Sequence, residues 1–104
     1  MGEIRMYDMS NLDKLATLQK NTPEALAAFQ ALDKAALAEG AIPVKYKELM
    51  ALAVALTTQC PYCLEVHKAA AKKAGATEQE LSETVFVATA LRAGAALTHG
   101  THLL

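Results

Sequence analysis

Hydrophobic residues recur every three or four positions along most of the chain, which is the spacing of one face of an α-helix. Leu12, Leu15 and Leu18 follow this spacing and predict a first helix over residues 11–20. The same pattern continues toward the C-terminus and predicts five helical segments in all, separated by residues that begin or end helices.

Threonine, proline and glycine mark the ends of the next segments. Thr22 before Pro23 is typical of an N-cap followed by the first helical position. The second helix is expected to run to about residue 39, where Gly40 ends it. A third helix is expected over residues 44–57.

Two further helix starts are visible in the second half of the chain. Pro61 predicts the start of a fourth helix with Cys60 near its cap, and Gly75 is expected to end that helix. Thr77 and Glu80 have the spacing of a capping box, in which each side chain bonds the other residue's backbone N–H. They predict the start of a fifth helix.

Two segments are apolar on every side. Residues 49–56 read LMALAVAL, and residues 85–97, where the fifth helix is expected to end, are interrupted mainly by Arg92. A helix that is apolar all round must be covered all round, and subunit contacts are the natural cover in a chain this short. We therefore expect a homo-oligomer, with one central helix in a monomer as the alternative. Residues 98–104 carry no clear pattern.

Composition supports an all-α fold. Alanine is the commonest residue, and isoleucine occurs only at positions 4 and 42, so helix-forming residues outweigh the branched residues that strands favour. A chain of 104 residues corresponds to a single domain, expected to span residues 1–104. The prediction is a compact bundle of about five helices with the cysteine pair at the start of a helix.

Charge and hydropathy exclude several classes of partner. The net charge is −1, and no basic face indicates nucleic-acid binding. Residues 1–11 lack the apolar core of a secretory signal, and the longest uncharged run, residues 49–64, is too short and too polar to span a membrane. The expected compartment is the reducing cytoplasm, where two cysteines indicate catalysis, redox sensing or metal binding.

The candidate chemistry lies in the segment Cys60-Pro61-Tyr62-Cys63, followed by His67. Residues three apart on a helix are neighbours, so the two sulfurs can meet, and His67 lies one turn after Cys63 on the same face. The N–H groups and dipole of the first helical turn favour negative charge. We expect both effects to favour the thiolate of Cys63.

Glu48 is the second part of the candidate site. It precedes Cys60 by 12 residues, so a tight hairpin of the third and fourth helices brings it within a turn of His67. Small side chains on the facing surfaces would let these helices approach closely, namely Ala51, Ala55, Ala70, Ala71 and Ala74. Glu48 could then orient His67, which in turn would polarise Cys63 as a general base.

These spacings resemble the motif of the alkylhydroperoxidase D-like branch of the carboxymuconolactone decarboxylase family. The motif is a glutamate, a CxxC pair twelve residues later and a histidine four residues after the second cysteine, here Glu48, Cys60, Cys63 and His67. The flanking residues 47–55 and 74–77, with Glu80, also look like the family, and the resemblance covers about residues 43–94.

The resemblance implies an all-helical oligomer, often a trimer or hexamer, that acts as a thiol-dependent peroxidase without a cofactor. It implies that Cys63 attacks the peroxide and becomes a sulfenic acid, and that Cys60 resolves it as a disulfide. Glu48 and His67 would relay protons, and an external thiol or dithiol reductant protein would restore the pair. Some peroxidase members have a histidine at the position of Tyr62, which is expected here to line substrate access.

Three alternatives remain open at this stage. The dithiol could exchange electrons with a protein partner or sense oxidation without turning over peroxide. The cysteines could be small buried core residues. Zinc could bind Cys60, Cys63 and His67 together with His99 or His102, although this spacing is unlike the usual paired ligands, and no metal is assigned.

Overall fold

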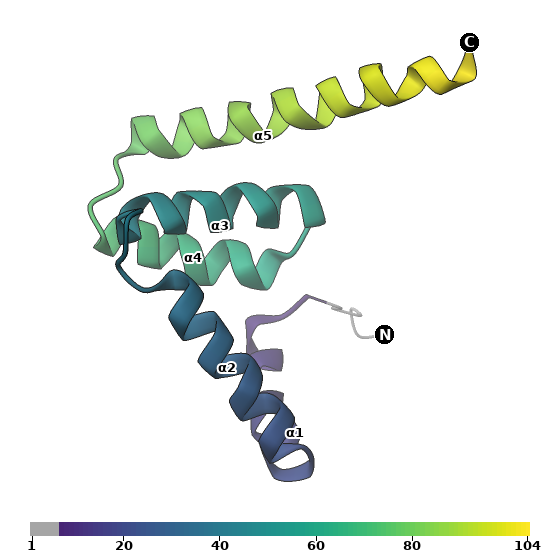
Figure 1. The fold of residues 1–104 in the computed structure, drawn as a ribbon. Coiled ribbons are helices and arrows are strands. Elements are labelled where there is room, and N and C mark those ends of the chain that lie inside the picture. Colours follow the sequence, from purple (N-terminus) through teal and green to yellow (C-terminus); the bar gives the residue numbers. More distant parts are fainter. Residues whose placement is uncertain (1–6) are drawn as a thin grey trace, which may run out of the picture.

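The computed structural model describes residues 7–104 and consists of helices joined by short turns (Figure 1). No strand occurs in residues 7–104, so the predicted all-α class is confirmed. In chain order the elements are the 3₁₀ helix η1 (Met9–Lys14), α1 (Leu15–Asn21), α2 (Pro23–Leu37), α3 (Val44–Thr58), α4 (Pro61–Lys73), α5 (Glu78–His99) and the 3₁₀ helix η2 (Gly100–Leu103).

Helix boundaries follow the capping residues closely in the second half of the chain. Gly75 ends the turn after α4 with φ of 96°, a left-handed conformation that a side chain would disfavour. Thr77 and Glu80 form both bonds of the predicted capping box at the start of α5. The structure extends α5 to His99 and continues the tail as η2.

The first half of the chain departs from the expected boundaries. The segment predicted as one helix over residues 11–20 begins as η1 and becomes α-helical only at Leu15. Thr22 lies at the N-cap of α2 but makes no side-chain cap bond, because its hydroxyl donates instead to the carbonyl of Leu18. Helix α2 ends at Leu37, since Ala38 already has extended backbone before Gly40 is reached.

Helices α3 and α4 form an antiparallel hairpin that is the centre of the fold. Gln59 turns the chain with φ of 56°, and the Cys60 N–H donates back to the Ala55 carbonyl, 3.1 Å away. The buried apolar side chains on this pair are small or medium-sized, and Ala71 is completely inaccessible. Small side chains at the contact let the two helix backbones approach closely. The hairpin thus holds position 48 opposite the first turns of α4.

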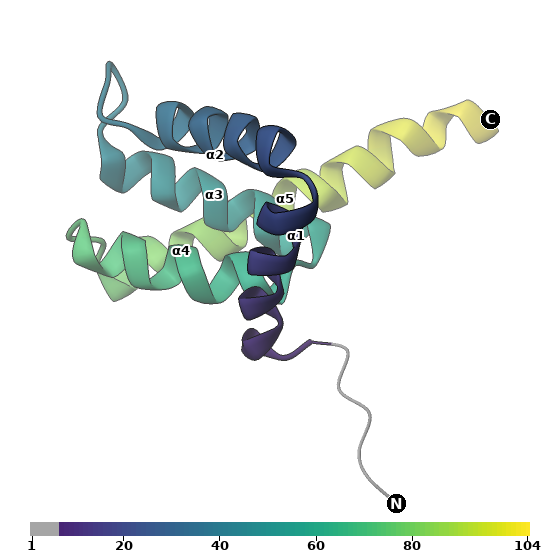
Figure 2. The same cartoon turned by 90° about the horizontal axis from the view of Figure 1, so that it is seen from below.

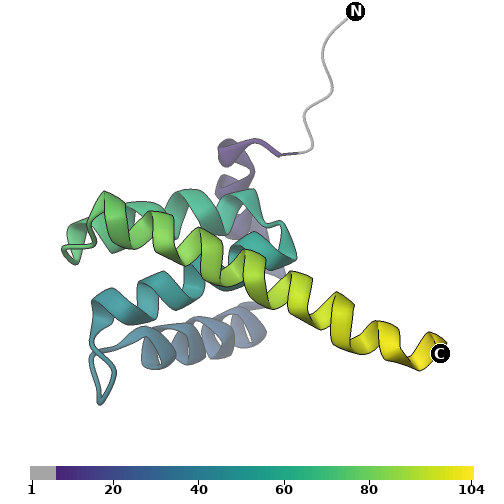
Figure 3. The same ribbon diagram turned by 90° about the horizontal axis from the view of Figure 1, so that it is seen from above.

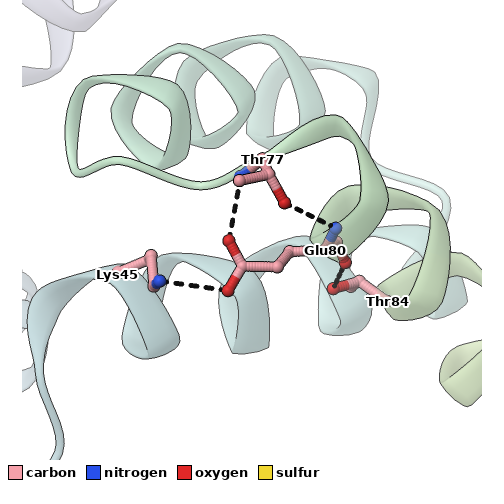
Figure 4. A network of polar contacts seen from close by, with 4 residues as sticks. All are labelled: Lys45, Thr77, Glu80 and Thr84. Atoms are coloured by element: carbon pink, nitrogen blue, oxygen red, sulfur yellow. Dashed lines mark hydrogen bonds and ion pairs between the residues drawn. The ribbon is translucent and has the colours of Figure 1, made fainter.

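Helix α5 crosses the hairpin, and its C-terminal part extends beyond it (Figures 1 and 3). A polar network fixes the crossing at one end (Figure 4). The Glu80 carboxylate accepts the backbone N–H of Thr77 at 2.9 Å and pairs with the Lys45 ammonium of α3 at 3.0 Å. The same residue therefore caps α5 and ties it to the start of α3.

A single copy of the chain leaves much apolar surface exposed. Phe86 is 72% exposed, Leu91 68% and Leu97 78%, all on α5. The radius of gyration is 17.0 Å, whereas a compact chain of this length has about 13 Å. Helices α1 and α2 also project away from the hairpin (Figure 1). The apolar segments identified in the sequence are therefore not covered within one chain.

Two expectations about the whole chain lie partly outside the described residues. The single-domain prediction for residues 1–104 and the absence of a secretory signal in residues 1–11 both involve residues 1–6. Among the residues that are described, no helix has the length and hydropathy needed to cross a membrane.

The network around Glu80 gives a pH-dependent prediction. Hydrogen bonding by the Thr77 N–H and then by Lys45 lowers the pKa of Glu80 below its ordinary value of 4.5, so its charged form stabilises the fold. Glu80→Gln keeps a side chain that can serve the capping box but removes the charge. We expect a small decrease in Tm at neutral pH. The difference in Tm between the variant and the wild type should become smaller as the pH falls below 4.5, because Glu80 of the wild type then becomes protonated.

Thermal unfolding followed by circular dichroism between neutral pH and pH 3 measures this difference. Glu83→Gln is the matched control, because Glu83 lies on the same helix and its carboxylate accepts only a long bond from Gln79, at 3.3 Å. If the Tm of Glu80→Gln stayed below that of the wild type by the same amount down to pH 3, the charge of Glu80 would not be the source of the stabilisation.

Candidate active site

The two cysteines are held together at the first turn of α4. Cys60 is the N-cap residue, and its sulfur accepts the backbone N–H of Cys63 at 3.3 Å. The two sulfur atoms are 2.7 Å apart, and both thiols are free and half-buried. A disulfide needs a sulfur–sulfur distance of about 2.05 Å, so a movement of well under 1 Å would bond them. The geometry therefore suits a dithiol that oxidises reversibly.

The contact between the two sulfurs shifts their pKa values in opposite directions. The hydrogen bond between the two side chains, with the bond from the Cys63 N–H, lowers the pKa of Cys60. The same contact between the side chains, together with partial burial, raises the pKa of Cys63. This net shift is opposite to the expected thiolate at Cys63, although a backbone hydrogen bond still lowers the pKa of Cys63. An N-cap side chain receives the N–H of the third helical residue, and here that side chain is Cys60.

Glu48 and His67 form a buried pair between α3 and α4. The His67 Nδ1 atom donates to the Glu48 carboxylate at 2.6 Å, because a carboxylate can only accept. The Glu48 residue is 6% exposed and the His67 side chain 19%. A carboxylate buried to this degree needs a hydrogen-bonding or charged partner, and His67 is that partner. The hairpin thus brings together the two residues that the sequence suggested would meet.

The orientation of His67 leaves its other nitrogen available. With Nδ1–H directed at Glu48, the neutral ring has Nε2 as its acceptor. His67 lies one helical turn after Cys63 on α4, so the imidazole and the second sulfur share a helix face. Within residues 7–104 the hydrogen bond of the ring runs to Glu48 and not to sulfur. The acid–imidazole contact is therefore in place on the helix face that also carries Cys63.

Tyr62 lies between the cysteines and is held from outside the CxxC segment. Its hydroxyl accepts a hydrogen bond from the Asn11 side-chain amide at 2.9 Å, and its ring lies 6.0 Å from the ring of Tyr7. Sequence analysis did not identify Asn11, because no local pattern links a residue near the N-terminus to one 51 positions later.

Comparison with known proteins identifies the family. The model of the carboxymuconolactone decarboxylase family matches residues 23–104. The chain belongs to this family. The resemblance noted from Glu48, Cys60, Cys63 and His67 is thereby confirmed at the level of the family, which includes the alkylhydroperoxidase D-like branch. Members of the carboxymuconolactone decarboxylase family are often enzymes, decarboxylases or peroxidases.

Individual members of the carboxymuconolactone decarboxylase family share the fold and part of the sequence. A crystal structure of a family protein without ligand, from Legionella pneumophila, aligns with a TM-score of 0.76 and 36% identity over 88% of this chain and 82% of that one. "Uncharacterized protein 4 in cox locus" of Paracoccus denitrificans is 46% identical over 74% of this chain and 69% of its own length. An uncharacterized protein of Cupriavidus necator is 34% identical over 71% of this chain and 66% of its own length.

The candidate zinc ligands do not lie together in the described residues. His99 and His102 pack edge-to-face with each other, 4.9 Å between ring centres, at the C-terminal end of α5. In the part of the chain that the structure describes, no three His, Cys, Asp or Glu side chains are arranged to hold a metal ion.

The opposite pKa shifts predict which sulfur reacts first with an alkylating reagent. Limiting iodoacetamide at neutral pH should modify Cys60 before Cys63, because the lowered pKa of Cys60 gives it more thiolate. Cys63→Ala removes the side chain that lowers the pKa of Cys60, so this pKa should rise. Cys60→Ala removes the side chain that raises the pKa of Cys63, so this pKa should fall toward that of an ordinary thiol.

Mass spectrometry of the labelled peptides across a pH series measures both effects. If Cys60 in Cys63→Ala, and Cys63 in Cys60→Ala, each kept the pH profile that it has in the wild type, the two sulfurs would not affect each other's pKa. Preferential labelling of Cys63 at every pH would mean that Cys63, and not Cys60, has the lower pKa.

Proposed function

We propose that the chain is a thiol-dependent peroxidase that reduces peroxides through a Cys60/Cys63 dithiol–disulfide cycle. The observation that carries this proposal is the pairing of two sulfurs, 2.7 Å apart, with a buried Glu48–His67 contact one helical turn away. An ionised sulfur supplies the nucleophile, and the imidazole supplies a route for protons. Membership in a family that includes peroxidases supports the same conclusion.

The proposed cycle needs the two cysteines of this site, a peroxide and one external dithiol. The Cys63 sulfur attacks the peroxide ROOH, the O–O bond breaks, and the products are a sulfenic acid and the alcohol ROH. Cys60 then attacks the sulfenic sulfur and releases water, which leaves the Cys60–Cys63 disulfide. An external dithiol reductant returns both electrons by disulfide exchange and becomes oxidised itself. A reducing compartment such as the cytoplasm would supply that partner.

Proton transfer explains how Cys63 can attack although its resting pKa is raised. Transfer of the Cys63 proton to Cys60 or to His67 Nε2 generates the Cys63 thiolate. His67 can return a proton to the leaving alkoxide, while Glu48 holds the ring and stabilises its charged form. The raised pKa then keeps Cys63 protonated until a substrate arrives.

A second function also has support, namely a redox adaptor or oxidation sensor that exchanges disulfides with a protein partner. The lowered pKa of Cys60 at the helix N-cap favours attack by that sulfur on another disulfide. Tyr62 stands where a peroxidase site could hold another histidine, and a phenol is a poor base near neutral pH.

Peroxide consumption with a dithiol donor tests the proposal. Cys63→Ser should reduce turnover to background, because the attacking sulfur is gone. Cys60→Ser should consume about one equivalent of peroxide and then leave a sulfenic acid that a dimedone probe traps. Rapid disulfide formation with poor turnover in the wild type would favour the adaptor instead.

The proton relay is tested by Glu48→Gln, which keeps the size of the side chain but removes its charge. We expect turnover to fall by about a hundredfold, the scale of one general acid–base contribution. Glu65→Gln is the matched control, since Glu65 lies on the exposed part of the same hairpin. Equal activity of these two variants would argue against a role for the Glu48–His67 pair.

We further propose that the protein functions as a homo-oligomer, a trimer or hexamer. The support is the apolar surface of α5 and of the groove between α3 and α5, which is lined by Tyr46, Leu49, Met50 and Val87. A second copy with the same exposed helices offers a matching apolar face.

Sedimentation velocity tests the association. The wild type should sediment as a trimer or hexamer, while Phe86→Asp and Leu91→Asp should shift the distribution to smaller species by placing a charge in an apolar contact. Lys72→Asp, on an exposed position of α4, serves as the control. A wild-type protein that remained monomeric at high concentration would overturn the proposal.

A further inference from the structure

The N-terminal part of the chain contacts the residue between the two cysteines. Tyr62 is the second residue of α4, so its side chain projects from the helix turn that carries both sulfurs. Its hydroxyl accepts the Asn11 amide N–H at 2.9 Å. Figures 1 and 2 show the η1 segment beside the end of the hairpin where α3 turns into α4. A segment distant in sequence therefore reaches the residue that lies between the two cysteines in the chain.

This segment is held in one conformation by its own hydrogen bonds. The Asp8 carboxylate accepts the Ser10 N–H at 2.9 Å and the Ser10 hydroxyl at 2.7 Å, and these bonds lower the pKa of Asp8. The Asn11 N–H donates to the Asp8 carbonyl at 2.8 Å. The turn thus directs the Asn11 side chain in a fixed direction.

A second contact holds the Tyr62 ring from its side. The centres of the Tyr7 and Tyr62 rings are 6.0 Å apart at an angle of 59°, within the range of a favourable aromatic pair. The hydroxyl and the ring of Tyr62 are therefore both restrained. The Tyr62 side chain is half-buried, whereas Tyr7 is 67% exposed. Without these contacts, a tyrosine in the first turn of a helix would sample several rotamers.

We propose that residues 7–11 form a strap that fixes the Tyr62 ring beside the dithiol and makes it a size filter. Small oxidants such as hydrogen peroxide or short alkyl hydroperoxides reach the sulfurs, while bulky hydroperoxides are held back on this side. The choice among peroxides rests on the proposed function. The filter itself acts on any thiol reagent and can be measured without peroxidase activity.

Two maleimides of different size test the filter on the reduced protein. The readout is the rate with N-pyrenylmaleimide divided by the rate with N-ethylmaleimide, which cancels changes in thiolate content. Asn11→Ala and Tyr62→Phe each remove the same hydrogen bond, and the phenylalanine keeps the ring. We expect each to raise the ratio about fivefold, the shift expected from losing one hydrogen bond. The double variant should change the ratio by less than the product of the two single effects, because the two side chains share this contact.

Two further variants separate the strap from general damage to the fold. Asn21→Ala changes an exposed asparagine at the end of α1 and should leave the ratio unchanged. Asn11→Asp offers a carboxylate that can accept from the Tyr62 hydroxyl, so it should keep the ratio close to wild type.

Three results would contradict the proposed strap. The first is a ratio of the two maleimide rates that is unchanged in both Asn11→Ala and Tyr62→Phe. The second is a double variant whose effect is the full product of the single effects, and the third is equal slowing of both reagents in Tyr62→Phe. The last result would mean that the hydroxyl acts on the sulfurs directly. A protein that filters maleimides but consumes no peroxide would refute the peroxidase proposal and leave the strap intact.

Discussion

The burial of the Glu48 carboxylate is the constraint on which the site depends. Removing an unpaired carboxylate from water costs several kcal/mol, so this side chain must find a partner wherever the hairpin closes. His67 is that partner, 2.6 Å away on the facing helix. The contact fixes the register of α3 against α4, and small alanine side chains allow the helices to come that close. Because α4 begins six residues before His67, the same register also sets where the cysteine pair lies.

Two separate devices act on the two sulfurs. The N-cap position gives Cys60 the backbone N–H of Cys63, and this bond, together with the contact between the sulfurs, lowers the pKa of Cys60. The imidazole lies one turn from Cys63 and is held by a carboxylate. Two thiols in contact titrate as a pair, so ionisation of one sulfur disfavours ionisation of the other. In the proposed peroxidase cycle, this difference would let attack and resolution fall to different sulfurs.

Much of this could be read from the sequence, because local chemistry determines helix ends. Pro61, Gly75 and the Thr77–Glu80 box each act within a few residues, and the 12-residue spacing from Glu48 to Cys60 is a property of one hairpin. Other features depend on contacts between distant segments, which no pattern encodes. The Lys45–Glu80 pair and the Asn11–Tyr62 bond belong to this class. The pKa shifts of the cysteines were not predictable for another reason: the contact between the two side chains acts in opposite directions on Cys60 and Cys63 and outweighs the backbone bond at Cys63.

The exposed apolar surface and the site place different demands on the chain. In the described residues 7–104, the contacts that define the site all lie within one chain: the sulfur pair, Glu48–His67 and Asn11–Tyr62. Much of the exposed apolar surface instead lies on α5, with further exposed side chains on α1 and α2, and no large side chain in those residues is fully buried. In the proposed oligomer, neighbouring subunits would cover α5. The hairpin holds the sulfur pair and the Glu48–His67 contact without using the exposed face of α5, so substitutions on that face should leave both contacts unchanged.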